Sequence, residues 1–139
     1  MTDDEKNELL DKLDLPETPQ ELAKWTHNMM QKLGVNVGLL QQEQESYSAG
    51  QIKEKLQEII AGFLLVAAVG DALETSFNEG GQSVEADLSE SLKSFRKCVD
   101  QGTRAARSAL GGDDDLKANA AVIYISFIGA ASNANKLFE

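Results

Sequence analysis

The chain is poor in the residues that build strands, disulfides and metal sites. Its 139 residues include only two prolines and one cysteine, and aromatic residues make up 6%. β-Sandwiches and barrels need aromatic and β-branched runs separated by frequent turns, so this composition disfavours them. The lone cysteine, Cys98, excludes an internal disulfide and a cysteine-based zinc site.

Histidine is equally scarce, which limits catalysis and metal chemistry. His27 is the only one, whereas a di-iron site in a helical bundle needs a glutamate followed three residues later by a histidine on two helices. Lys24 stands three residues before His27, so the motif does not occur. The glycine pairs at 80–81 and 111–112 lack the Lys-Ser/Thr of a phosphate loop. We therefore expect no metal, no cofactor and no enzymatic activity, and we interpret His27 as a surface residue.

Positive charge is also in short supply. The chain has 13 lysines and arginines against 23 aspartates and glutamates, a formal net charge of −10. This charge opposes binding to bare nucleic acid or to an anionic membrane, because both are negative. The first residues have neither the basic nor the apolar stretch of a secretory signal. We expect a single cytoplasmic domain over residues 1–139, since this length is typical of one domain.

Helix boundaries are marked by capping residues and glycines. Thr18 to Glu21 reads as a capping box with Pro19 at the first helical position, and Gly34 is the expected end of that helix. Ser48 and Gln51 form a second cap signature. The predicted main helices span residues 19–33, 51–78, 84–110 and 114–137. Residues 1–16 are acidic and are expected to form a short N-terminal helix or a partly mobile segment, and residues 35–48 a short helix or an ordered connection.

The third predicted helix carries one narrow apolar stripe. Its members recur at steps of three or four residues, the spacing of one helical face. They are Val84, Leu88, Leu92, Phe95, Val99, Gly102, Ala106 and Ala109. Such a stripe predicts an amphipathic helix that covers a core.

Two other helices carry runs that are apolar on nearly every side, residues 59–70 and 120–131. A helix that is apolar all round is expected at the centre of a fold. Neither run reaches the roughly 20 residues that span a bilayer, so we interpret both as core helices and expect no membrane association. Short connections then predict an all-α antiparallel bundle of about four main helices. One chain covers two such helices incompletely, which suggests a homodimer.

Charged residues are segregated along the chain. The three arginines share one predicted helix with two lysines, and most of these five side chains fall near one face: Lys93, Arg96, Lys97, Arg104 and Arg107. This row is a candidate docking surface for an acidic partner, or a solvated face that pairs with the acidic residues of the chain itself. Asp71 follows an apolar run and is a candidate buried charge. The alternatives are an ion pair with a basic residue of a neighbouring helix and simple exposure near the end of the helix.

These observations favour a non-enzymatic module that binds another protein through its acidic surface and its arginine and lysine face. An inhibitor, an immunity or antitoxin-like factor, and a dedicated chaperone or adaptor all fit that description. The alternative is a carrier or sensor whose small apolar ligand lies between the two apolar helices.

Overall fold

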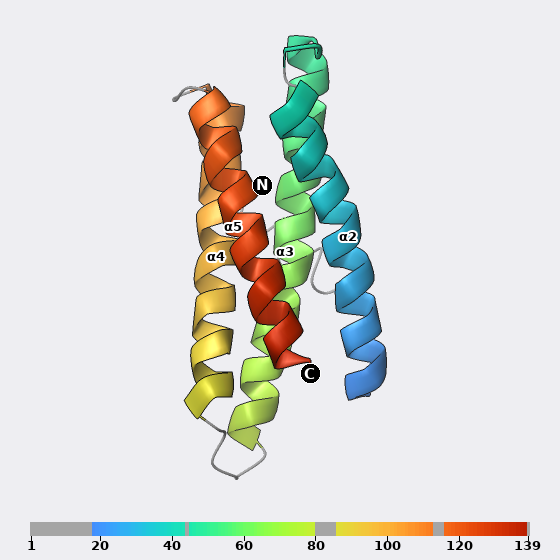
Figure 1. The fold of residues 1–139 in the computed structure, drawn as a ribbon, viewed down its shortest axis with the longest axis vertical. Helices are drawn as coiled ribbons and strands as arrows, with labels where there is room; N and C mark the ends of the chain where they lie inside the picture. Colours follow the sequence, from blue (N-terminus) through green and yellow to red (C-terminus); the bar gives the residue numbers. More distant parts are fainter. Residues whose placement is uncertain (1–17, 44, 80–85, 113–115, 139) are drawn as a thin grey trace.

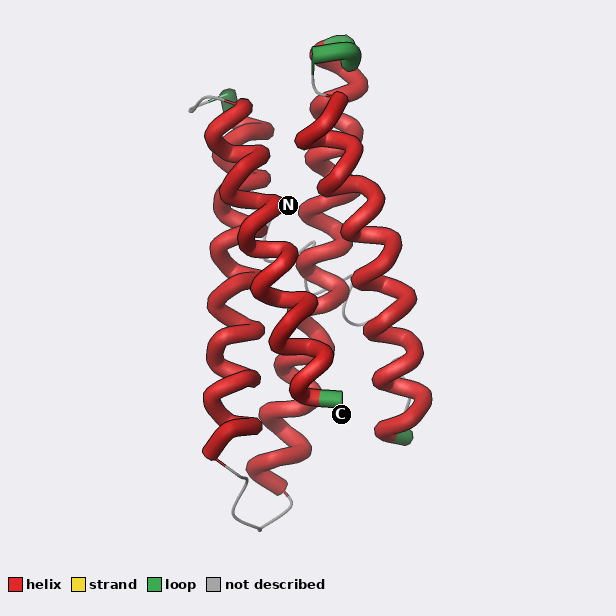
Figure 2. The backbone as a smooth tube through the Cα atoms, in the orientation of Figure 1, coloured by secondary structure: helices red, strands yellow, loops and turns green. Residues whose placement is uncertain are grey.

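The computed structural model describes residues 18–43, 45–79, 86–112 and 116–138. These residues form four α-helices, labelled α2 (Pro19–Glu43), α3 (Ala49–Glu79), α4 (Ala86–Gly111) and α5 (Leu116–Leu137) (Figure 1). Figure 2 shows no strand in this part of the chain. The all-α prediction is confirmed, while the expected N-terminal helix lies outside the described residues.

Side chains hold the beginnings of two helices as the cap signatures predict. The Glu21 amide donates to Thr18 Oγ1 at 3.2 Å at the start of α2. At the start of α3 the capping box is reciprocal, because Gln51 N donates to Ser48 Oγ at 3.2 Å and Ser48 N donates to Gln51 Oε1 at 2.9 Å. These bonds satisfy amides that have no partner inside the helix.

Helix α2 is longer than predicted. It continues through Gly34 to Glu43, so residues 35–43 are helical and the expected end at Gly34 is wrong. Glycine costs only about 1 kcal/mol in a helix interior, whereas the extra turns bury Val37 and Leu40 completely. Gly34 has another role, because a Cβ there would come within 2.7 Å of the Phe127 ring of α5.

The four helices form an antiparallel bundle in which each helix packs against two neighbours. α3 lies between α2 and α4, and α5 lies between α4 and α2 (Figure 1). The α4–α5 contact is the most extensive and the α2–α5 contact the least. Small residues allow the close α4–α5 approach, since a Cβ on Gly129 would lie 2.6 Å from Cys98 Sγ. Because α3 and α5 each pack only against α2 and α4 among the described helices, they stand at opposite corners of the bundle.

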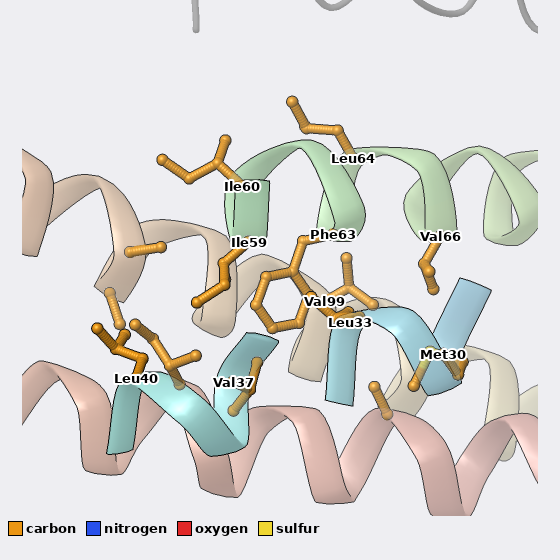
Figure 3. Close-up of a cluster of buried hydrophobic side chains, with 14 of the residues drawn as sticks. Met30, Leu33, Val37, Leu40, Ile59, Ile60, Phe63, Leu64, Val66 and Val99 are labelled. Atoms are coloured by element: carbon orange, nitrogen blue, oxygen red, sulfur yellow. The ribbon is translucent and has the colours of Figure 1, made fainter. Parts of the chain in front are cut away.

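The core fills the space between these corners. The ring of Phe63 on α3 is fully buried and points toward Leu33 and Val99 (Figure 3). The stripe of α4 contributes to the same cluster, in which Leu92, Phe95, Val99 and Ala106 are buried.

The two apolar helices differ in burial. In α3 the run at 59–70 lies largely inside the bundle. As a whole, residues Ala49–Thr75 of α3 are long and apolar enough to cross a membrane, but half of the most apolar stretch is buried in the bundle. The length of the 59–70 run therefore does not exclude a span for α3 as a whole, and burial in the bundle is instead typical of the core helix of a soluble protein. In α5 only Asn119, Ala120, Ile123, Ser126, Ala130 and Ala134 are buried. The expectation that α5 is a central helix is therefore wrong.

Candidate protein-interaction surface

The predicted basic row lies on α4 but does not act as one uniform surface. Lys93, Lys97, Arg104 and Arg107 are exposed on one side of the helix. Arg96 is half-buried and turns toward α3, where its guanidinium bonds to Asp71 Oδ1 at 2.5 Å and also pairs with Glu74. Arg96 is therefore a bridge between two helices and not a free cation of the row.

The prediction of a buried charge at Asp71 is wrong. Its side chain is 51% exposed, and its carboxylate pairs with Arg96. The first of the alternative interpretations, an ion pair with a basic residue of a neighbouring helix, is what the structure contains. Gly70 is buried and faces Phe95 of α4. Asp71 is the next residue around the helix and lies at the solvent-exposed edge of α3.

A groove of about 520 Å³ runs between α3 and α4 beside this ion pair. Leu64 and Val99 are among its apolar residues, and its charged residues are of both signs: Asp71, Arg96, Lys97, Asp100 and Arg107. Asp100 is engaged by Arg104 at 3.1 Å. Cations and carboxylates alternate here, so the groove has no strong preference for an anion.

A different surface is chemically more distinctive, and it lies on α5. Four large apolar side chains are exposed there: Ile125 (70%), Ile128 (48%), Val122 (45%) and Tyr124 (38%). Ala118, Ala121 and Ser132 are exposed beside them. We call these seven residues the α5 face. Ala118, Ala121, Ile125, Ile128 and Ser132 recur at steps of three or four residues. Val122 and Tyr124 flank this row on opposite sides, so the seven residues form one broad side of the helix.

The α5 face has no charge within it. Lys117 and Lys136 are the only charged residues of α5, and residues 118–135 contain none. Burial explains the uncharged run at 59–70 of α3, but it does not explain this one. Exposed apolar surface of this kind marks an interaction site more often than it marks a solvated helix.

A groove of about 620 Å³ adjoins the α5 face, between α5 and α2; its lining is mainly apolar and also includes Thr26, His27, Gln31 and Asn135. Met30 and Ala23 line it from α2, and Phe127 and Ala131 line it from α5. The ring of Phe127 also lies against Gly34 of α2. The residues that follow these two in the chain, Val35 and Ile128, therefore lie next to the same α2–α5 contact. Val35 is 61% exposed, and it extends the apolar surface from α5 onto α2.

The remaining chemically versatile residues are dispersed. His27 is exposed and lines the α2–α5 groove, while Cys98 is partly buried against α5. Within the described ranges, no group of three or more His, Cys, Asp or Glu residues is arranged to hold a metal ion.

The sequence reasoning missed the α5 face because the run at 120–131 suggested burial on all sides. One signal was available. Small residues recur on the buried side of this helix, where Ile123 is the one large apolar residue, whereas Val122, Tyr124, Ile125 and Ile128 lie on the outer side.

Comparison with known proteins adds no relative. No protein-family model, no curated protein and no solved structure matches this chain.

Proposed function

We propose that this protein is a non-enzymatic helical module that works by binding another protein through the α5 face. An inhibitor, an immunity or antitoxin-like factor, and a chaperone or adaptor are the classes that fit this description. A cytoplasmic location is part of the proposal, because a single partly buried cysteine suits a reducing compartment.

The exposure of Ile125 and its neighbours carries the proposal. Monomeric proteins rarely leave a contiguous patch of large apolar side chains in water. Burying such a side chain stabilises a complex by about 1.5–3 kcal/mol before the cost of association is subtracted. The face also resembles the anchor cluster at the centre of protein interfaces, where a few buried residues supply most of the affinity.

The charges of the chain would affect the rate of association and the rim of the interface, and not its apolar centre. The chain has a net charge of −10, which favours fast encounter with a basic partner. The exposed cations Lys93, Lys97 and Arg107 make no ion pair with any residue that the structure describes. They would contact acidic groups at the rim of a complex, and such contacts weaken as salt rises.

A second candidate function is the carriage of a small apolar ligand. The predicted position between α3 and α5 is filled by the buried core (Figure 3). The α2–α5 groove is the better location, because its volume of about 620 Å³ lies within the roughly 300–1,000 Å³ of ligand sites.

Photocrosslinking from the α5 face tests the protein-binding proposal. A benzophenone amino acid replaces Ile125 in one variant and Gln57 in the control, which is exposed on α3. Irradiation in the native host should give a discrete crosslinked species from position 125 and none from position 57. Equal labelling from both positions, or none from either, would contradict the proposal.

The ligand candidate has its own measurement. Organic extraction of the purified protein followed by mass spectrometry should release an apolar compound if the groove is a carrier site. Replacing Ala131 with Phe should then abolish its retention, because the added ring would occupy the groove. Protein that yields no extractable compound would rule this candidate out.

A further inference from the structure

We propose that the α5 face is the surface through which two copies of this chain pair, with α5 packed antiparallel on α5 about a two-fold axis near Ile125. This inference rests on the proposed function, because it names the first partner of the same face.

The distribution of charge points to a second copy. Two molecules of net charge −10 repel each other over most of their surfaces. α5 contains no acidic residue, and its two lysines stand at its ends. The α5 face is therefore where two copies meet with least repulsion.

Uncharged exposed residues also lie beside the α5 face on the two neighbouring helices. On α2, Gln31 lines the groove and Val35 follows Gly34, which meets Phe127 of α5; both are exposed. On α4, Ser94 and Gln101 are exposed and stand four residues before and three residues after Cys98, which faces Gly129 of α5. All of these residues are uncharged. Uncharged side chains therefore flank the α5 face on both neighbouring helices, with Lys24, seven residues before Gln31, as the cation toward the beginning of the α2 flank.

The arrangement of side chains favours antiparallel pairing. Residue 125 lies halfway between Ala118 and Ser132, the ends of the face, and Ile125 is its most exposed member. A two-fold axis at this residue places Ile125 against its own copy and Val122 against Ile128 of the partner subunit. Ala118 then faces Ser132 of the partner subunit, so small side chains meet at both ends of the contact. Parallel pairing would instead bring each of Lys117 and Lys136 against its own copy.

The size of the contact sets a further condition. A standard interface takes about 800 Å² and 20–30 residues from each partner. With six of its 22 residues buried inside the bundle, α5 alone offers fewer residues than that. The interface must include part of a flank, and Val35, at 61% exposure, makes α2 the apolar choice.

Sedimentation velocity on the purified full chain gives the first test. The wild type should sediment as a dimer at tens of micromolar, and Ile125→Glu should raise the dimer dissociation constant by about 100-fold or more, because the axis places two added carboxylates together. Gln57→Glu adds the same charge to an exposed site on α3 and should leave the dimer intact. A wild type that stays at about 15 kDa, or a dimer that Ile125→Glu leaves intact, would overturn the inference.

Disulfide trapping tests the register. In a Cys98→Ala background, Ile125→Cys should oxidise rapidly to a covalent dimer, since residues on the axis can approach within the roughly 4.4–6.8 Å between Cα atoms that a disulfide needs. Gln57→Cys in the same background is the matched control and should oxidise only slowly. Equal rates for the two variants would overturn the placement of the axis near Ile125.

These outcomes separate the two proposals. A purified chain that stays monomeric, together with a specific crosslink from position 125 to a different protein in the host, would refute the pairing of copies and support the proposed function. A dimer trapped through Ile125→Cys with no other crosslinked protein would limit the protein-binding function to self-association.

Discussion

Gly102 of α4 lies directly against the ring of Phe63 of α3, so closely that a Cβ on Gly102 would overlap three atoms of the ring. Phe63 is completely buried at the centre of the core. The missing side chain on one helix is what admits the aromatic ring of the other.

Gly102→Ala should therefore destabilise the fold although alanine favours helices. Overpacking of this kind costs about 1–3 kcal/mol, which exceeds the roughly 1 kcal/mol gained in helix propensity. Urea unfolding followed by circular dichroism measures the change. The matched control is Gly38→Ala in the interior of α2, where an added Cβ meets nothing within 4 Å, and this variant should gain about 0.5–1 kcal/mol. If both variants were stabilised, the contact with Phe63 would not be as tight as described.

Ser48→Ala should lower the free energy of unfolding by about 1 kcal/mol. The Ser48 hydroxyl accepts from Gln51 N at the beginning of α3, and the substitution leaves that amide without its partner. Thermal unfolding of Ser48→Ala and Ser46→Ala compares two exposed serines in the same connection. Ser46→Ala should change stability by less than about 0.5 kcal/mol, and a similar loss in both variants would speak against the cap.

The ion pair between Arg96 and Asp71 should contribute little to stability. The two side chains are 40% and 51% exposed, and pairs at such sites give about 1 kcal/mol or less. A double-mutant cycle with Arg96→Met and Asp71→Asn should return a coupling in this range that decreases as salt is added. A coupling above about 2 kcal/mol that salt does not change would mean that the pair is desolvated.

Asn119→Leu should stabilise the protein by about 1 kcal/mol. The side-chain nitrogen of Asn119 is buried and has no hydrogen-bond partner among the described residues, and an unsatisfied buried group costs about 1–3 kcal/mol. Asn133→Leu on the same helix is the control, because Asn133 Nδ2 donates to Gly129 O at 2.9 Å. Calorimetric melting should show a gain for Asn119→Leu alone, and a loss would mean that the Asn119 amide has a partner.

Local chemistry accounts for most of what could be predicted about the fold. The caps at Thr18 and Ser48 and the stripe through Leu92, Phe95 and Val99 are properties of neighbouring residues, and the structure agrees with them. The end of α2 was misjudged because Gly34 reads locally as a stop. The burial of Val37 and Leu40 against other helices outweighs that local preference.

The candidate surface was much less predictable. Arg96 and Lys97 are adjacent in the chain, and only the position of α3 turns one toward Asp71 and leaves the other in solvent. The α5 face raises the same difficulty, because an apolar residue can be buried in its own bundle or exposed for a partner.

By itself, the sequence determined that the chain is helical, where most of its helices begin, and which side chains of α4 face the core, because caps and periodicity act within a few residues. Tertiary structure alone decided that α3 would be the buried apolar helix and α5 the exposed one. The deciding factor is the order of packing around the bundle, which depends on how residues far apart in the chain, such as Gly34 and Phe127 or Phe63 and Gly102, fit together.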